Sequence, residues 1–240
     1  QQWIDERLGW LNDERPDAGV EDVGVTTEVV WASPVQDAIL SHVASSRSDL
    51  VIKDVHHENL LQRVLLKPLD WHLLRTCPVP LLLVHSSTDA APRRVIAAVD
   101  ASHTPTGEAD LNDRIIKAAR DLARECSAQL HLAFSFCGPG GMLGSQGSGL
   151  GAIGRLRDLL LPVQTKNFNT LADANDVPHD RRHFLHGLPA ETLADFTRRN
   201  FNDVLVIGAM RHTLMDRLLM GTAAEAILDR TTCNVLAVKL

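Results

Sequence analysis

The sequence predicts an α/β protein made of two tandem copies of one domain with a parallel sheet. Three observations support this prediction. Short apolar runs are nearly continuous rather than alternating, as in parallel strands that are covered on both faces. Amphipathic, helix-like stretches lie between these runs, which is the order of βαβ units. Finally, the second half of the chain repeats the first at a constant offset.

The predicted elements follow one another along the whole chain. Helical spacing of apolar residues is clear in RIIKAARDLAREC, where Ile115, Ala119 and Leu122 share a side. The predicted helices are residues 34–43, 114–126 and 189–199, with a helix-like piece at 3–10. The predicted strands are residues 25–30, 50–53, 81–84, 95–99, 130–136, 204–207 and 235–238, and RRHFL at 181–185 is strand-like.

The repeat defines the domain organisation. Residues 48–85 align without a gap on residues 202–239, so that Asp49 falls on Asp203 and Val84 on Val238. We therefore expect a first domain at residues 1–87 and a second at residues 93–240, joined by the polar linker SSTDAAP. The first copy has no counterpart of the strand RRVIAAVD or of the helix and strand after it. Two strands and a helix, roughly 50–70 residues by the size of a βαβ unit, are therefore expected to be absent from it.

Composition excludes several classes of function. The 240 residues carry a net charge of −6 without a basic block and contain no Tyr, which argues against nucleic-acid binding. Four widely spaced cysteines without a CxxC pair indicate buried, reduced thiols rather than zinc or disulfides. The sequence contains no run of 18 apolar residues, so no membrane span is predicted. No signal peptide is visible either, and we therefore expect a cytoplasmic protein.

One segment, VLVIGAMRHTLMDRLLMGTAAEAILD, carries the pattern of an anion site. A strand ends at Gly208, and a helix-like run begins at Gly221-Thr222, with Arg211 between them. Glycines let the backbone approach a phosphate, and the free N–H groups of a helix start favour negative charge. The carboxyl ends of parallel strands are where open α/β sheets bind ligands. The alternative is that Gly221-Thr222 only caps a helix.

The spacing resembles the universal stress protein family, whose nucleotide-binding members carry Gly-x2-Gly-x9-Gly-Ser/Thr here. Gly208, Gly221 and Thr222 match, while Arg211 replaces the second Gly. RRVIAAVDAS is similar to the family's first strand, which ends in an Asp near the nucleotide, here Asp100. KPLDWHLLRTCPVPLLLV resembles the first domain of the tandem universal stress protein E group.

This resemblance implies two flavodoxin-like domains (Rossmann-like, adenine nucleotide alpha hydrolase-like) with parallel five-stranded sheets, the first N-terminally incomplete. It also implies a stress-response role. Single-domain members dimerise through their last strands, so residues 80–84 and 235–238 are expected to pair across a pseudo-twofold, with a homodimer as a further possibility. The implied nucleotide site comprises Asp100, Gly208, Arg211, Gly221 and Thr222.

The two copies differ in their expected capacity for ATP. In the first copy, Asp54 and His57 replace the glycines, and Lys67-Pro68 replaces Gly-Ser/Thr. Proline removes an N–H donor and an Asp repels phosphate, so ATP is expected in the second copy alone. Two interpretations of Arg211 stay open: a phosphate ligand with a fork of donors, or a side chain that fills the space of the missing Gly.

Two rival motifs are weaker. Residues 149–154 read GxGxxG, but a Gly/Ser-rich run separates them from the preceding strand, so we interpret them as a surface loop. The histidines 56, 57, 179, 183 and 186, with Glu58, lack the spacing of metal ligands, so no metal is expected and solvated or hydrogen-bonded rings are favoured.

Three functional hypotheses remain. The first is a non-catalytic stress-response module that binds or senses a small ligand. The second is a weak ATPase built on the proposed nucleotide residues, although no residue is nominated as a base or nucleophile. The third is a carrier of an apolar or lipid-like ligand between or within the domains, where a pocket in the first copy would include Leu60, Leu61, Val64, Leu65 and Leu66. Helical core is the alternative interpretation of the neighbouring LDWHLL.

Overall fold

The computed structural model describes residues 2–13, 24–55, 69–85, 91–102, 109–138, 150–198, 203–209, 226–228, 230–231 and 233–239. The chain divides into two compact units, Gln1–Ser45 and Ser46–Leu240. Within the described residues, no helix has the length and apolar character that crossing a membrane requires.

The first unit contains α1 (Gln2–Asp13), an extended segment, and most of α2 (Val35–Ser46). The edge of the Trp3 ring meets the Trp31 ring at a centroid distance of 5.5 Å, and Thr27 Oγ1 donates to Asn12 Oδ1 at 2.6 Å. The strand predicted at residues 25–30 is wrong, because no strand forms in this segment. At the offset of 154 it corresponds to residues 179–184, which include the start of β5 (Arg182–His186). In the described sheet, β5 pairs with β4 (Gln129–Phe136) alone.

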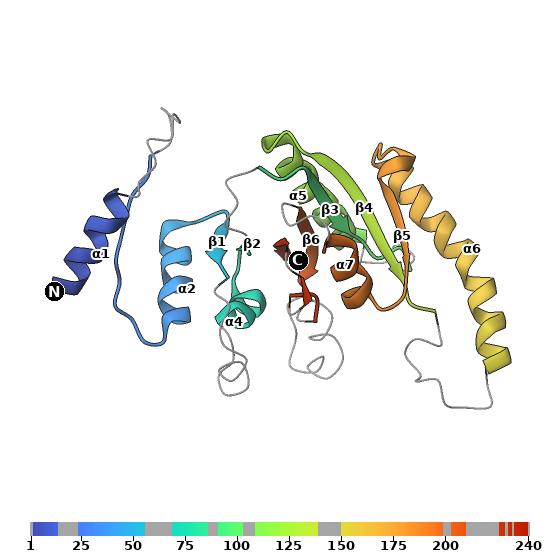
Figure 1. Cartoon of the computed structure of the whole chain (residues 1–240), viewed down its shortest axis with the longest axis horizontal. Coiled ribbons are helices and arrows are strands. Elements are labelled where there is room, and N and C mark those ends of the chain that lie inside the picture. The colour runs from blue at the N-terminus through green and yellow to red at the C-terminus, as the bar shows by residue number, and fades with distance from the viewer. Residues whose placement is uncertain are drawn as a thin grey trace. The chain divides into compact units, whose positions relative to one another are not determined.

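The second unit is organised around one seven-stranded sheet (Figure 1). The strand order is β1-β2-β7-β6-β3-β4-β5, and every neighbouring pair is parallel except β2 with β7. The prediction is confirmed for six of the predicted strands, and β5 coincides with the strand-like RRHFL. The remaining strands are β1 (Val51–Asp54), β2 (Leu81–Val84), β3 (Arg94–Ala98), β6 (Val204–Ala209) and β7 (Asn234–Lys239).

The strand register reproduces the sequence repeat. In the first copy Val51 pairs with Leu81, and in the second Leu205 pairs with Val235, each residue 154 positions from its counterpart. In the antiparallel contact Leu82 faces Leu236, which is its own counterpart. A local twofold therefore passes through this pair, and the predicted pairing of the two last strands is confirmed. The second copy contributes five parallel strands and the first copy two.

Helices cover both faces of the second copy's strands. On one face, α5 (Ala109–Glu125) and α6 (Leu150–Ala174) pack on the main apolar cluster, which includes Val95, Leu132 and Phe168. On the other face lies α7 (Pro189–Thr197), which contributes buried Leu193 and Ala194. In the first copy, α4 (Leu69–Thr76) contacts β2 and buries Leu73 and Leu74, so the core interpretation of LDWHLL is confirmed for these two.

The main error of the sequence analysis concerns α6. Residues 150–154 of the GxGxxG motif belong to this 25-residue helix and not to a loop. Glycine and Pro162 weigh locally against a helix, but Phe168 and Ala172 are buried farther along it. Tertiary packing therefore overrides propensity. The preceding strand, β4, ends at Phe136, so the tight strand-to-helix turn of a dinucleotide fingerprint is not present.

Candidate functional site

Asp100 and Gly208 lie at the same edge of the sheet, where the strand order reverses. β3 is parallel to β6, with Ala97 beside Val206. From β3 the chain builds β4 and β5 on one side, and β6 and β7 continue on the other. Asp100 lies two residues after the end of β3, and Gly208 is the last but one residue of β6. The two predicted residues therefore flank the topological switch point, where sheets of this kind bind ligands.

Asp100 is held in a defined loop. Its backbone N–H donates to Asn112 Oδ1 at 3.0 Å, and Asn112 Nδ2 donates back to its carbonyl at 2.7 Å. The carboxylate accepts from the backbone N–H of Ser102 at 2.8 Å, and also from the Ser102 hydroxyl. Because Asn112 belongs to α5, the helix fixes the position of Asp100 relative to β3.

Gly208 has a packing role in addition to any contact with a ligand. A Cβ atom at this position would lie 2.8 Å from Leu111 Cδ2, closer than real Cβ contacts. Leu111 belongs to the first turns of α5, so the absence of a side chain lets this helix pack against β6. The sequence pattern predicts this glycine for the close approach of a phosphate. In the described residues, its close neighbour is Leu111.

The other predicted site residues fall outside the described part of the chain. These are Arg211, Gly221 and Thr222, and in the first copy His57, Lys67 and Pro68. Asp54 is described and ends β1, at the position equivalent to Gly208. The first copy thus carries a carboxylate where the second copy has a glycine.

Two cationic residues at this edge were missed by the sequence analysis. Lys239 is level with Ala209 of β6 and only 6 % exposed. Arg114 of α5 reaches the same strand end, where its Nη1 donates to the carbonyl of Lys239 at 3.3 Å. The signal was a single Lys in the buried run NVLAVK. Positive charge at this depth favours an anion nearby.

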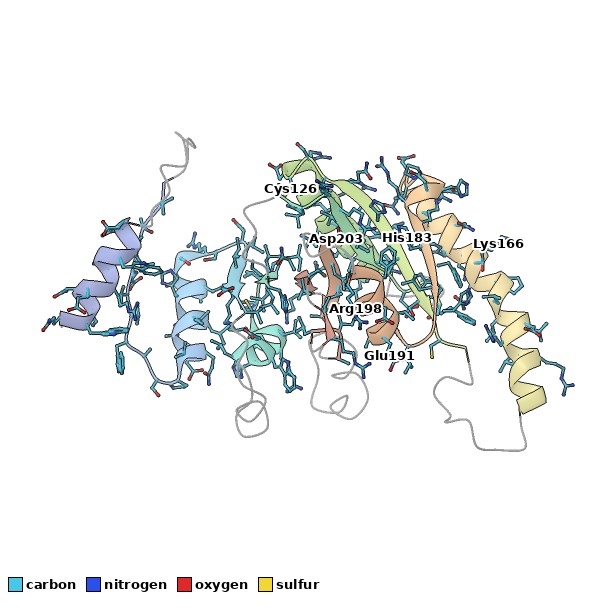
Figure 2. The ribbon with its side chains drawn as sticks, viewed as in Figure 1. Cys126, Lys166, His183, Glu191, Arg198 and Asp203 are labelled. Carbon is cyan, nitrogen blue, oxygen red and sulfur yellow. The ribbon has the colours of Figure 1, made fainter. Side chains whose placement is uncertain are left out.

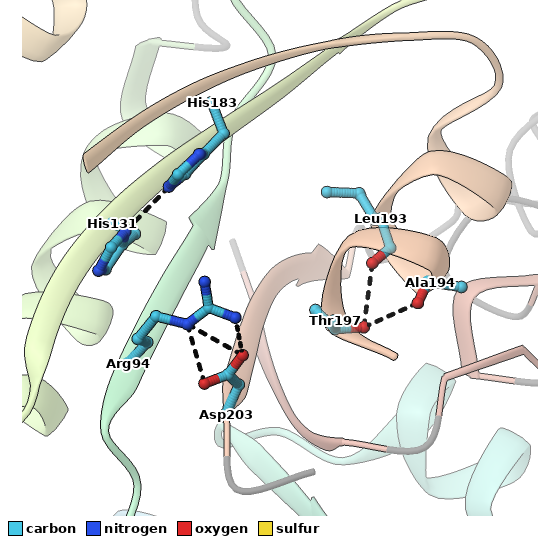
Figure 3. Close-up of polar contacts among 7 residues, drawn as sticks. All are labelled: Arg94, His131, His183, Leu193, Ala194, Thr197 and Asp203. Atoms are coloured by element: carbon cyan, nitrogen blue, oxygen red, sulfur yellow. Dashed lines mark hydrogen bonds and ion pairs between the residues drawn. The ribbon is translucent and has the colours of Figure 1, made fainter. Parts of the chain in front are cut away.

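The opposite, amino-terminal edge of the sheet contains an ion pair between a partly exposed arginine and a buried aspartate. Arg94 begins β3 and Asp203 precedes β6 (Figure 3). Arg94 Nε donates to both carboxylate oxygens of Asp203 at 3.1 Å, and Arg94 Nη2 donates to Oδ2. Asp203 is 2 % exposed. This fork of charge-assisted hydrogen bonds ties β3 to β6.

A pair of histidines lies beside this ion pair. His131 Nδ1 is 2.9 Å from His183 Nε2, and the rings stack with centroids 5.2 Å apart (Figure 3). Burial, together with the nearby His183, Arg94 and Arg181, lowers the pKa of His131 to about 4, although Asp180 acts in the opposite direction. Burial and Arg94 also lower the pKa of His183. Both rings are therefore neutral near pH 7, and the hydrogen-bonded state expected for His183 is confirmed.

The expectation of buried thiols is confirmed for two of the four cysteines. All four are free, and Cys77 and Cys233 are buried, whereas Cys126 and Cys137 are partly exposed. Burial raises the pKa of Cys233 to about 11, so its thiol stays protonated. Among the residues that the structure describes, no group of three or more His, Cys, Asp or Glu side chains could hold a metal ion.

The family assignment comes from the comparison with known proteins. The family model for universal stress proteins matches residues 6–85 and 92–239. The chain belongs to the universal stress protein family. Two separate matches agree with the tandem arrangement and with the strand register, and the resemblance stated from the sequence is confirmed.

Curated relatives within the universal stress proteins cover nearly the whole chain. The universal stress protein E homolog of Haemophilus influenzae is 25% identical over 226 residues, which cover 91% of this chain and 71% of that protein. Universal stress protein E of Escherichia coli K12 is 25% identical over 255 residues, which cover 98% and 75%.

Solved structures show the same fold. A functionally unknown protein of Pseudomonas aeruginosa PAO1 superimposes with a TM-score of 0.74 at 23% identity, over 99% of this chain and 77% of that chain. A universal stress protein of Archaeoglobus fulgidus gives a TM-score of 0.58 at 15% identity, over 100% and 79%.

Proposed function

We propose that this chain is a cytoplasmic stress-response module that binds a small ligand, and that the ligand is an adenine nucleotide held by the second copy. The observation that carries the proposal is the placement of Asp100 and Gly208 on either side of the switch point. Arg211, Gly221 and Thr222 follow β6 in the chain and complete the proposed site.

The electrostatics at this edge support an anionic ligand in the second copy. Arg114 and Lys239 bring positive charge to the ends of β6 and β7. Backbone amides of the Gly221-Thr222 segment would supply donors for phosphate oxygens. In the first copy the carboxylate of Asp54 stands at the equivalent place and opposes phosphate binding.

Binding rather than catalysis is the proposed role. In the described part of the carboxyl edge, the side chain of Asp100 accepts hydrogen bonds from Ser102, and no neighbouring base and nucleophile are brought together. ATP hydrolysis and apolar-ligand transport remain as outcomes of the test. The residues proposed for an apolar pocket, at positions 60–66, lie outside the described residues. Leu73 and Leu74 are buried in the core.

Calorimetric titration with Mg-ATP tests the proposal. We expect saturable binding that weakens by about tenfold or more in Gly221→Asp. The introduced carboxylate would occupy the space of a phosphate and repel its negative charge. Asp100→Ala should weaken binding as well. Asp49→Ala is the matched control, since it removes an exposed carboxylate of the first copy. No heat with the wild-type chain, or equal affinity in Gly221→Asp, would overturn the proposal.

Two additions identify the ligand and the role of Arg211. Native mass spectrometry of the freshly purified chain separates a co-purified nucleotide from a lipid by the added mass. Arg211→Gly restores the motif, and we expect tighter ATP binding after this change. Weaker binding would assign Arg211 as a phosphate ligand, and measured ADP release would indicate hydrolysis instead of simple binding.

A further inference from the structure

An open cavity lies at the opposite end of the strands from Asp100 and Gly208. Its volume is about 380 Å³, at the lower end of the range for small-molecule sites. It lies between the last turns of α5 and α6, next to the start of β4. The lining residues are Arg120, Ala123, Arg124, Ala128, Leu130, Ala174, Asn175, Asp176 and Arg181.

The charges in this cavity do not balance. Three guanidinium groups line it against one carboxylate, that of Asp176, although the whole chain carries a net charge of −6. Arg120 Nη2 donates to the carbonyl and the side-chain oxygen of Asn175, at 3.1 and 3.0 Å. Both acceptors are neutral, so Arg120 caps the end of α6 and keeps its positive charge uncompensated.

The other two arginines make few hydrogen bonds or ion pairs with the described protein. Arg124 is 72 % exposed, and its Nη1 lies 4.0 Å from Asp121 Oδ1, a distance at which a surface pair contributes little. The guanidinium of Arg181 makes no hydrogen bond or ion pair within the described residues, and its Nε is buried. A buried donor without a partner is destabilising, and a bound acceptor would satisfy it.

We propose that this cavity binds a small polyanion, with clustered phosphate or carboxylate oxygens, through Arg124 and Arg181 and with support from Arg120. The fork of a guanidinium matches two oxygens of one such group. The partial negative charge at the ends of α5 and α6 opposes an anion, but two full positive charges in excess outweigh it. The site is independent of the proposed nucleotide site, because it lies at the amino-terminal edge of the same sheet.

Titration with pyrophosphate, and separately with citrate, tests this proposal at constant ionic strength. Both the wild-type chain and Gly221→Asp are titrated, so that a contribution from the carboxyl edge is recognised. Saturable binding of either anion should weaken by about tenfold or more in Arg124→Gln/Arg181→Gln, the effect of losing a charge-assisted hydrogen bond. The preferred probe distinguishes phosphate from carboxylate chemistry.

Arg198→Gln is the matched control. It removes one positive charge from an exposed position directly after α7, where Arg198 pairs with Asp195. Figure 2 shows Arg198 far from Cys126, which directly follows α5. We expect unchanged affinity in this variant, and circular dichroism verifies the fold of each. Absence of saturable binding in the wild-type chain, or equal affinity in the double variant and the control, would refute the proposal. If Gly221→Asp loses ATP binding but keeps pyrophosphate binding, the two sites bind their ligands independently.

Discussion

β1 and β6 occupy equivalent positions in the repeat and pair in the same register with β2 and β7, yet their environments differ. The first four residues of β6 are buried, whereas Ile52 in β1 is 63 % exposed. β6 has β3 on its other side, and β1 pairs in the described sheet with β2 alone. Local sequence therefore determines that a strand forms and in which register, while its neighbours determine how much of it is buried. Residues 154 positions apart provide matched pairs for testing this difference.

The largest expected difference concerns the two aspartates that precede these strands. Asp203 is buried and bonded to Arg94, whereas its counterpart Asp49 is exposed. Asp203→Asn removes the carboxylate beside the guanidinium of Arg94, and breaking a buried pair costs about 3–5 kcal/mol of unfolding free energy. Asp49→Asn should change stability by about 0.5 kcal/mol or less.

Chemical denaturation of both variants measures this prediction, and the double variant Arg94→Met/Asp203→Leu sharpens it. Replacing both partners by apolar groups should recover much of the loss, since no charge is left buried. Equal effects of the two single substitutions would mean that the ion pair contributes nothing specific to the second copy.

The next effect is a pH dependence that arises in the second copy, from His131 in β4 and His183 in β5. The gapless repeat of residues 48–85 on residues 202–239 includes neither histidine. Because the pKa of both histidines is lowered in the folded protein, the unfolded chain binds more protons as the pH falls below about 6.5. Stability is therefore complete above that pH and decreases down to about pH 4, by ~3 kcal/mol at most for His131.

Urea denaturation between pH 4 and 7.5 measures this decrease. His131→Gln should flatten the pH profile, because the buried titrating ring is removed, whereas His179→Gln at an exposed position should keep it. A profile of the same slope in both variants would show that other groups cause the decrease.

The repeat and the apolar runs were enough to predict most strands, because both can be read from neighbouring residues and from self-similarity. The contact between β2 and β7 was predicted from the resemblance to the universal stress protein family. The edge position of Asp100 and Gly208 also followed, since each directly follows or ends a predicted strand. The arrangement around Gly208 did not follow, because its contact with Leu111 depends on how α5 packs against β6.

Other features could not be predicted because they depend on strand order. Arg94 and Asp203 are 109 residues apart, and His131 and His183 are 52 residues apart. Only the assembled sheet brings each pair together. The helix α6 was missed for a related reason: the burial of Phe168 against distant strands stabilises a helix that begins among glycines. The strand expected at residues 25–30 is the opposite case. Its local sequence pattern is that of a strand, but the described structure gives it no neighbouring strand to pair with.

The smallest difference is expected between Val206 and Ile52, which are equivalent positions at the centres of β6 and β1. Val206 is fully buried, so Val206→Ala leaves a cavity and should cost about 2 kcal/mol. Ile52→Ala removes a larger side chain, but one that is mostly in solvent, and should cost under about 1 kcal/mol. Thermal and urea denaturation of the two variants compare them directly. If Ile52→Ala is the more destabilising substitution, a surface outside the described sheet covers β1 in solution. The two copies would then differ in which surface covers each strand, and not in whether the strand is covered.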